Sequence, residues 1–256
     1  MKIAKIADVV ATILVIAIFF SLVYMAAGVP EGASPSFVSS TSRNATNPTQ
    51  TRSDDGGVIA TVNLQGTVNQ LKWKAYVGNV TGVLVLADGN GYSIYEWTLT
   101  STITGDVFAT RNNSISWGNI SCARNDTISF EDDYLNHSPG ASDNINNTFL
   151  NNQHTAFLVN SITLSNCPTL YPYVNNTAAA SPSASNDFPI ILIGANTTVG
   201  GNITNGTSGD ALIYAVSIQL DKRGYNNIST YDFELVVADS ASATGATAYY
   251  FYLELD

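Results

Sequence analysis

The sequence predicts an all-β fold, an antiparallel β-sandwich of Ig-like or jelly-roll-like type, which follows an N-terminal transmembrane helix and a flexible linker. Three observations support this prediction: an apolar run near Met1, a stretch rich in Ser, Thr, Pro and Gly, and then hydrophobic residues that alternate with a period of two. Half-buried strands show that period because successive side chains point to opposite faces of a sheet. We therefore expect three parts, residues 1–29, 30–56 and 57–256.

The first part contains an apolar segment that is long enough to cross a bilayer. Val9–Pro30 carries no charge, and a helix of about 20 apolar residues spans the hydrocarbon. Lys2 and Lys5 precede it, which predicts a cytoplasmic N-terminus and an exported remainder. A cleaved signal peptide is the alternative, with small residues at 26–28 as its cleavage site, although such apolar regions usually have about 7–15 residues. A retained helix makes this a cell-membrane protein whose bulk is extracellular.

The second part, residues 30–56, is rich in Ser, Thr and Pro and has no hydrophobic period. This composition is typical of a flexible stalk. Within it, only Ser36–Ser40 resembles a strand.

Alternation locates most strands of the third part. Every second residue of Leu71–Val77 is apolar, with Trp73 expected on the core side. Val80–Leu86 and Tyr92–Leu99 flank turn-forming residues and predict a β-hairpin in which Trp97 also faces the core. The other strand candidates are Val58–Leu64, Asp106–Thr110, Ile115–Ser121, Ala156–Leu164, Pro189–Ile193, Ala211–Leu220, Phe233–Val237 and the C-terminal TAYYFYLEL. Many short strands at this spacing are typical of a sandwich.

The segment at about 126–186 differs from its surroundings because it is Asn-rich and has no regular period. We expect an irregular insertion within the same domain, with at most one short helix near Ser142–Leu150.

Two cysteines, Cys122 and Cys167, lie in the exported part. An isolated pair in an oxidising compartment most simply forms one disulfide, which would tie the insertion back to the domain. No neighbouring His or second Cys supports a catalytic or metal-binding thiol.

The glycosylation sequon Asn-x-Ser/Thr occurs twelve times, more often than composition alone predicts, which indicates a coat of N-linked glycans. The acceptors are Asn44, Asn79, Asn112, Asn119, Asn125, Asn136, Asn146, Asn175, Asn196, Asn202, Asn205 and Asn227.

The net charge of −10 argues against a nucleic-acid partner, because phosphate binding needs clustered Lys and Arg. Beyond position 56 the basic residues are Lys72, Lys74, Arg111, Arg124, Lys222 and Arg223.

The Ser nucleophile elbow, the zinc-protease helix, the phosphate loop and the dinucleotide fingerprint are all absent, so we expect neither an enzyme nor a cofactor. Glycoside hydrolysis stays open by motif because it needs only two carboxylates, but the sequence singles out no such pair. Glu131, Asp132 and Asp133 form the best cation candidate, since adjacent carboxylates repel unless they are solvated or neutralised; a solvated loop is the simpler interpretation, with calcium as the alternative. Asp88–Gly91 predicts a plain turn. His137 and His154 lack a second ligand at helical spacing.

Three segments, WKAYVGNVTGVLVLADGNGYSIYEW, GDVFATR and SWGNISC, resemble a group of uncharacterised archaeal secreted or membrane-anchored surface proteins. The resemblance covers roughly residues 30–122 and implies a cell-surface setting, without assigning any activity or residue role. A looser likeness to archaeal pilin-type subunits rests on the basic leader, the apolar helix and the glycosylated β-rich head. Asp8, the lack of a processing site and Pro30 depart from that pattern.

These features predict an anchored surface glycoprotein with a structural or adhesive role, whose partners are the membrane, other surface proteins or further copies of itself. The first alternative is a filament subunit, either pilin-like or strand-donating. The second is a carbohydrate- or ligand-binding module that uses exposed aromatic residues such as Tyr76 or Trp117.

Overall fold

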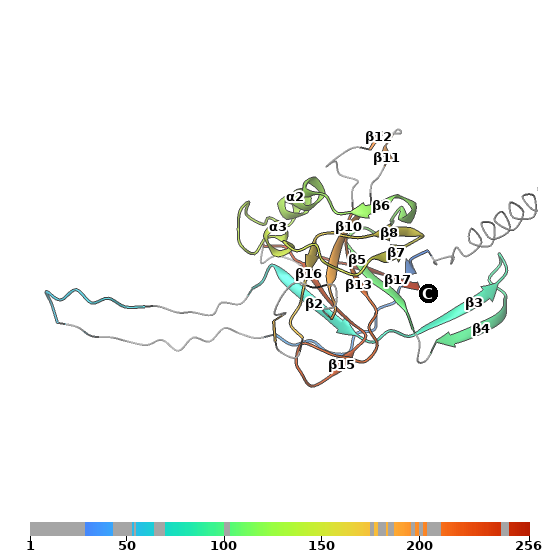
Figure 1. The fold of residues 1–256 in the computed structure, drawn as a ribbon, viewed down its shortest axis with the longest axis horizontal. Coiled ribbons are helices and arrows are strands. Elements are labelled where there is room, and N and C mark those ends of the chain that lie inside the picture. The colour runs from blue at the N-terminus through green and yellow to red at the C-terminus, as the bar shows by residue number, and fades with distance from the viewer. Residues whose placement is uncertain are drawn as a thin grey trace, which may run out of the picture.

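A central antiparallel sheet organises the protein (Figure 1). The computed structural model describes residues 29–42, 53, 55–63, 70–99, 103–174, 177–178, 183, 187–195, 198–199, 202–203, 211–241 and 246–256. Within them, seven strands form one sheet in the order β1-β17-β5-β13-β10-β6, and β9 pairs with β10 beside β6. Their bounds are Glu31–Gly32 (β1), Tyr250–Leu255 (β17), Gly105–Thr110 (β5), Ala211–Ser217 (β13), Ile190–Ala195 (β10), Ile120–Cys122 (β6) and Thr169–Leu170 (β9). The predicted all-β, antiparallel class is confirmed.

The middle strands of this sheet are covered on both faces. All of β10 and nearly all of β13 are buried, and their sequences, IILIGA and ALIYAVS, are almost continuously apolar. Strands that are buried on both faces have this composition, because neither set of alternating side chains meets water. Two hydrophobic cores therefore lie on opposite faces of one sheet.

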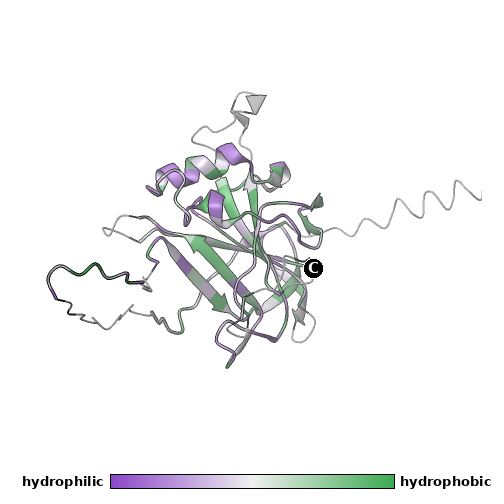
Figure 2. Cartoon of the chain, turned by 60° about the vertical axis from the view of Figure 1, so that its left-hand side comes forward, coloured by the Kyte–Doolittle hydropathy of each residue, from purple (hydrophilic) through white to green (hydrophobic). Residues whose placement is uncertain are grey.

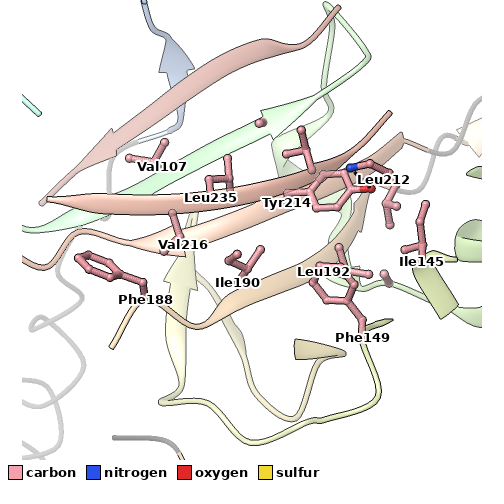
Figure 3. Packing of buried hydrophobic residues seen from close by; sticks show 14 of the residues in the cluster. Val107, Ile145, Phe149, Phe188, Ile190, Leu192, Leu212, Tyr214, Val216 and Leu235 are labelled. Atoms are coloured by element: carbon pink, nitrogen blue, oxygen red, sulfur yellow. Dashed lines mark hydrogen bonds between the residues drawn. The ribbon is translucent and has the colours of Figure 1, made fainter. Parts of the chain in front are cut away.

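The first core, which we call the helix-side core, lies between the sheet and a layer of two strands and two helices. Tyr214 and Val216 of β13 contribute to it, together with Leu192 of β10 and Leu235 of the covering strand β16 (Figure 3). The covering elements are β2 (Trp73–Gly78), which pairs with β16 (Phe233–Ala238), and the helices α2 (Asn125–Tyr134) and α3 (Ile145–Thr148). The strands predicted at β2, β16 and β17 are confirmed. The predicted core-side position of Trp73 is confirmed too, because its ring packs against this core.

The second core, the hairpin-side core, is covered by a short β-hairpin and a 3₁₀ turn. Its sheet residues include Phe108, Ile193 and Ile213, and the covering elements are β7 (Phe157–Val159), β8 (Ile162–Leu164) and η1 (Trp117–Asn119). The turn of the hairpin places Asn160 and Ser161 at positive φ, as a tight two-residue hairpin loop requires. The single strand expected over Ala156–Leu164 is therefore two strands joined by this turn.

Besides β2–β16 and β7–β8, three further strand pairs of the described residues lie outside the central sheet. They are β3 (Gly82–Ala87) with β4 (Ser93–Leu99), β11 (Thr198–Val199) with β12 (Asn202–Ile203), and β14 (Lys222–Arg223) with β15 (Thr230–Tyr231). The first pair, Gly82–Leu99, is called the arm below, because it extends away from the body of the molecule (Figure 1). The predicted hairpin is thus present, but its expected core contact is wrong: Trp97 is 48% exposed.

The chain joins the central sheet almost at its first described residue. Glu31 and Gly32 pair with Leu253 and Tyr252 on the outer edge of β17, and Pro30 is buried. Main-chain pairing on an open edge needs no hydrophobic pattern, so the expected stalk contains a strand at its start, whereas Ser36–Ser40 forms none. Within the described residues, no helix is long and apolar enough to cross a membrane. The predicted span Val9–Pro30 lies outside them except for its last two residues.

The Asn-rich segment 126–186 is more regular than expected. It contains most of α2, all of α3 and the strands β7, β8 and β9, and it contributes buried residues to both cores. The expectation of at most one short helix is wrong, because α2 was not foreseen. Figure 2 shows why: the helices at the top of the view are largely hydrophilic, whereas the strands beneath them are largely hydrophobic.

Two other strand predictions are wrong in detail. Residues 58–63 form no strand, and Leu64 lies outside the described residues. The strand expected over Ile115–Ser121 begins only at Ile120, because η1 occupies residues 117–119.

Candidate functional site

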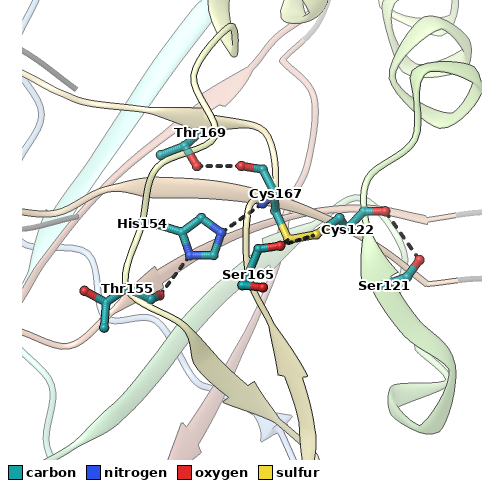
Figure 4. The surroundings of a disulfide bond; sticks show 7 residues. All are labelled: Ser121, Cys122, His154, Thr155, Ser165, Cys167 and Thr169. Atoms are coloured by element: carbon teal, nitrogen blue, oxygen red, sulfur yellow. Dashed lines mark hydrogen bonds between the residues drawn. A yellow bond between two sulfur atoms is a disulfide. The ribbon is translucent and has the colours of Figure 1, made fainter. Parts of the chain in front are cut away.

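The predicted disulfide between Cys122 and Cys167 is present (Figure 4). It joins the end of β6 to the residues just before β9, and these two strands share the same edge of β10. The His154 ring lies beside it: its Nε2 accepts a hydrogen bond from the Cys167 N–H at 3.0 Å, and its Nδ1 donates to the Thr155 carbonyl at 2.9 Å. Both ring nitrogens are therefore engaged in holding the chain around the disulfide.

Most of the sequon asparagines that the structure describes face solvent. Six of the seven whose exposure is described are exposed, whereas Asn112 is half-buried. The exposed ones are Asn79, Asn119, Asn125, Asn136, Asn146 and Asn227. Asn202 lies in β12, and Asn44, Asn175, Asn196 and Asn205 lie outside the described residues. Exposed acceptors are the geometry that an N-glycan requires.

The three consecutive carboxylates of α2 do not converge on one point. Glu131 is buried and forms a bidentate ion pair with Arg111, with Nε–Oε1 and Nη2–Oε2 distances of 2.5 and 2.6 Å. Asp132 is buried against His137, with a 2.9 Å contact between its Oδ1 and the ring Nδ1. Asp133 is exposed. The candidate calcium site is therefore not formed, and no group of three metal-ligating side chains occurs among the described residues.

Asp132 instead stabilises the start of α3. It accepts hydrogen bonds from the N–H groups of Ile145 and Asn146, and the Asn144 side chain caps the same helix by accepting from Asn147 N–H. Carboxylates and Asn caps both satisfy the unpaired amides at a helix N-terminus. His137 Nε2 is also engaged, at 2.8 Å from the Asp239 carbonyl. This cluster is a structural one.

Two further carboxyl groups, those of Asp106 and Glu254, lie side by side on neighbouring strands of the central sheet. Glu254 of β17 and Ser217 of β13 are the direct cross-strand neighbours of Asp106 on β5. Ser217 donates a 2.6 Å hydrogen bond to Asp106, and Asn160 N–H, in the β7–β8 turn, donates to Glu254 Oε1 at 3.1 Å. Glu254 Oε2 is buried and, within the described residues, has no hydrogen-bond donor.

Burial raises the pKa of both acids, Asp106 and Glu254, to about 7. A carboxyl oxygen without a donor favours the protonated form, because an ionised oxygen would remain unsolvated. Both residues are at most 4% exposed, so their carboxyl groups are shielded from solvent and their protonation is coupled to folding.

Of the two aromatic residues considered as ligand platforms, one is buried and the other is half-buried. Trp117 is buried and packs against Phe108 and Tyr252, with ring centroids 5.1 and 5.3 Å apart. Tyr76 is half-buried and makes an edge contact with Phe251 at 5.0 Å. The ligand-binding interpretation therefore loses the two residues that suggested it.

One pocket, of about 480 Å³, lies beside α2 and the start of β17. Among the described residues that line it, only Arg111 is charged, and it is already paired with Glu131 and stacked on the Tyr134 ring at 3.7 Å. The pocket therefore offers no unpaired charge to a ligand.

The arm is the described part of the surface where large apolar side chains are most concentrated. Eight of them are between 37% and 81% exposed: Val83, Leu84, Val85, Leu86, Tyr92, Ile94, Tyr95 and Trp97. The turn at its tip is closed by Asp88, which accepts hydrogen bonds from the N–H groups of Asn90 and Tyr92, both at 2.9 Å. This confirms that Asp88–Gly91 is a turn.

No protein-family model, curated protein or solved structure matches this chain.

Proposed function

We propose that this chain is an archaeal cell-surface glycoprotein, held in the membrane by its N-terminal apolar helix, whose β-rich head has a structural or adhesive role. The observation that carries the proposal is the exposure of six sequon asparagines across separate elements of the head. The disulfide supports it, because disulfides persist in oxidising compartments. The proposal keeps an antiparallel sandwich as the plan of the head, with the central sheet as one layer and β2–β16 within the other.

The test is to fractionate native cells and to analyse this protein by peptide mass spectrometry. We expect it in the membrane fraction, with residues 1–29 retained and glycans on the exposed asparagines. Asn112, which is half-buried and whose carbonyl accepts a hydrogen bond from the Tyr252 hydroxyl, should be the least occupied of the seven. Recovery from the cytosol without glycans would rule the proposal out.

A filament subunit is the second candidate, and the exposed arm is the observation that favours it, because an unpaired strand edge can add to a sheet of another molecule. Imaging of native envelopes by electron cryo-microscopy distinguishes the two. Regular filaments that contain this chain would support the second candidate, and isolated heads on the membrane would support the first.

A further inference from the structure

The arm has apolar side chains on both of its faces. In its register, Leu84 lies opposite Trp97 and Leu86 opposite Tyr95, so these four side chains form one face. On that face the centroids of the Tyr95 and Trp97 rings are 4.8 Å apart. Val83 and Val85 lie on the other face, opposite Thr98 and Glu96. An isolated two-stranded hairpin is at best marginally stable in water. The arm therefore lacks the covering layer that the rest of the head possesses.

The exposed apolar area of the arm is divided between its two faces. Aromatic side chains bury about 150–250 Å² each when they are covered and aliphatic ones bury less. Because the eight side chains are between 37% and 81% exposed, the two faces together expose on the order of 800 Å². Each face alone exposes about half of this area, within the range of the largest apolar patch of a monomer, about 300–600 Å². Pairing through a strand edge draws its affinity from main-chain hydrogen bonds instead.

The backbone of the arm is also open to a partner. Within the described residues β3 pairs only with β4, so each strand has one edge of unpaired amides and carbonyls. Natural edge strands are usually protected by Lys, Pro or a bulge that bends them away. The strand β3, GVLVLA, has no charge and no Pro, and its one register shift lies at its end, between Leu86 and Ala87. The arm contains no sequon, although Asn79 and Asn112 flank it in sequence.

We infer that the arm binds the arm of a second copy of this chain, through antiparallel pairing of β3 with β3 about a two-fold axis. A lipid surface could cover one face of the arm, but it offers no hydrogen bonds to the strand edges. Pairing through β3 buries the uncharged strand and keeps the two copies of Glu96, on β4, on the outside. It also joins the two Leu84–Leu86–Tyr95–Trp97 faces into one four-stranded surface. The inference deepens the proposed surface function and rests on it only for the exported state of the head.

The first test uses a matched pair of cysteine variants of the full chain, in native membranes and in detergent. Val85 and Glu96 lie directly opposite each other in the arm, and both native cysteines are in the disulfide. Val85→Cys should form an intermolecular disulfide under mild oxidation. Glu96→Cys should not, because two outer strands are separated by about three strand spacings of 4.8 Å, beyond the reach of a disulfide. The reverse pattern would overturn pairing through β3.

The second test measures self-association of the full chain by analytical ultracentrifugation in detergent. Leu84→Lys with Leu86→Lys should weaken the dimer at least 100-fold, because it places like charges across the axis. The control, Leu150→Lys, changes a residue that is 74% exposed outside the arm and should leave the dimer unchanged. A monomeric wild type, or a dimer that tolerates both lysines, would overturn the inference.

Lipid contact is the rival outcome. Lipid contact is measured by the quenching of Trp97 fluorescence by vesicles of brominated lipid. Trp73→Phe and Trp117→Phe make Trp97 the only tryptophan of the protein. Strong quenching in a monomeric protein would assign the arm to the membrane and overturn self-association. Glycan occupancy, measured on the same samples, tests the proposed surface function separately. Failure of self-association would therefore not imply failure of the surface function, and the reverse also holds.

Discussion

At the scale of single residues, Asp106 and Glu254 are expected to make the head less stable as the pH rises. Both have a folded-state pKa of about 7, above the ordinary values of about 4. The folded chain therefore binds more protons than the unfolded chain between about pH 4 and pH 7. The stability that comes from this difference is complete below pH 4 and is lost as the pH rises through 7.

We predict that the free energy of unfolding falls from pH 4 to pH 8 by on the order of 4 kcal/mol for each acid, since each folded-state pKa lies about three units above its ordinary value and one unit is worth about 1.4 kcal/mol. Asp106→Asn with Glu254→Gln should flatten this dependence, and Asp133→Asn, at an exposed carboxylate, should not. Thermal unfolding across this range measures it. Stability that rises from pH 4 to pH 8 would contradict the account.

Gly105 is the residue on which the pairing of β5 with β17 depends. Its φ is +136°, and a Cβ added there would overlap the backbone carbonyl of Glu254. Gly105→Ala should cost about 3 kcal/mol or more, because strained backbone costs about 1–3 kcal/mol even without a clash. Gly118→Ala, where nothing lies near an added Cβ, is the control. Denaturant unfolding measures both, and equal effects would contradict this role.

At the scale of elements, the disulfide is predicted to hold β6 and β9 together along β10. It closes a loop with a sequence separation of 45 residues, for which chain entropy gives about 4 kcal/mol. Cys122→Ala with Cys167→Ala should lower the free energy of unfolding by that order. Amide exchange should then rise first in β6, β9 and the β7–β8 hairpin, and uniform exchange throughout the sheet would argue against a local role.

The hydrophobic pattern of the sequence predicts some elements and not others. The period of two predicts β2, β3, β4, β16 and β17, because each has at least one face that meets water or a thin covering layer. It fails for α2, whose buried residues are Thr127, Ile128, Glu131 and Asp132. With Glu131 neutralised by Arg111 and Asp132 bonded to α3, this helix buries polar groups and leaves no apolar stripe to recognise.

The same limit applies to the candidate sites. The cysteine count predicts the disulfide, because an isolated pair in an oxidising compartment has only one possible pairing. Local spacing misplaces Trp97, since alternation shows which residues share a face but not whether any layer covers that face. It does not reveal the Asp106–Glu254 pair either, because strands of a half-exposed sheet would point such acids to water, whereas this sheet is covered on both faces.

At the scale of the whole molecule, the head is predicted to fold without its arm. None of the eight exposed arm residues belongs to either core, and only Leu99, at its base, packs against the helix-side core. Gly82 pairs directly with Leu99, so an Asn-Gly turn can replace residues 83–98. We expect the melting temperature of this variant to stay within a few degrees of wild type while self-association is lost. A head that unfolds would show that the arm belongs to the core.

The short strand β1 has a mechanical consequence. If the N-terminal segment is held in a membrane, as proposed, tension on the head acts first on two paired residues and on the hydrogen bond from Ala33 N–H to the Phe251 carbonyl. These contacts are far fewer than those that join β5, β13 and β10, so they yield first. The chain from Ala33 to Lys72 could then extend to about 140 Å, at about 3.5 Å per residue. The head would thus be carried close to the cell at rest and released outward under load, with its central sheet and disulfide intact.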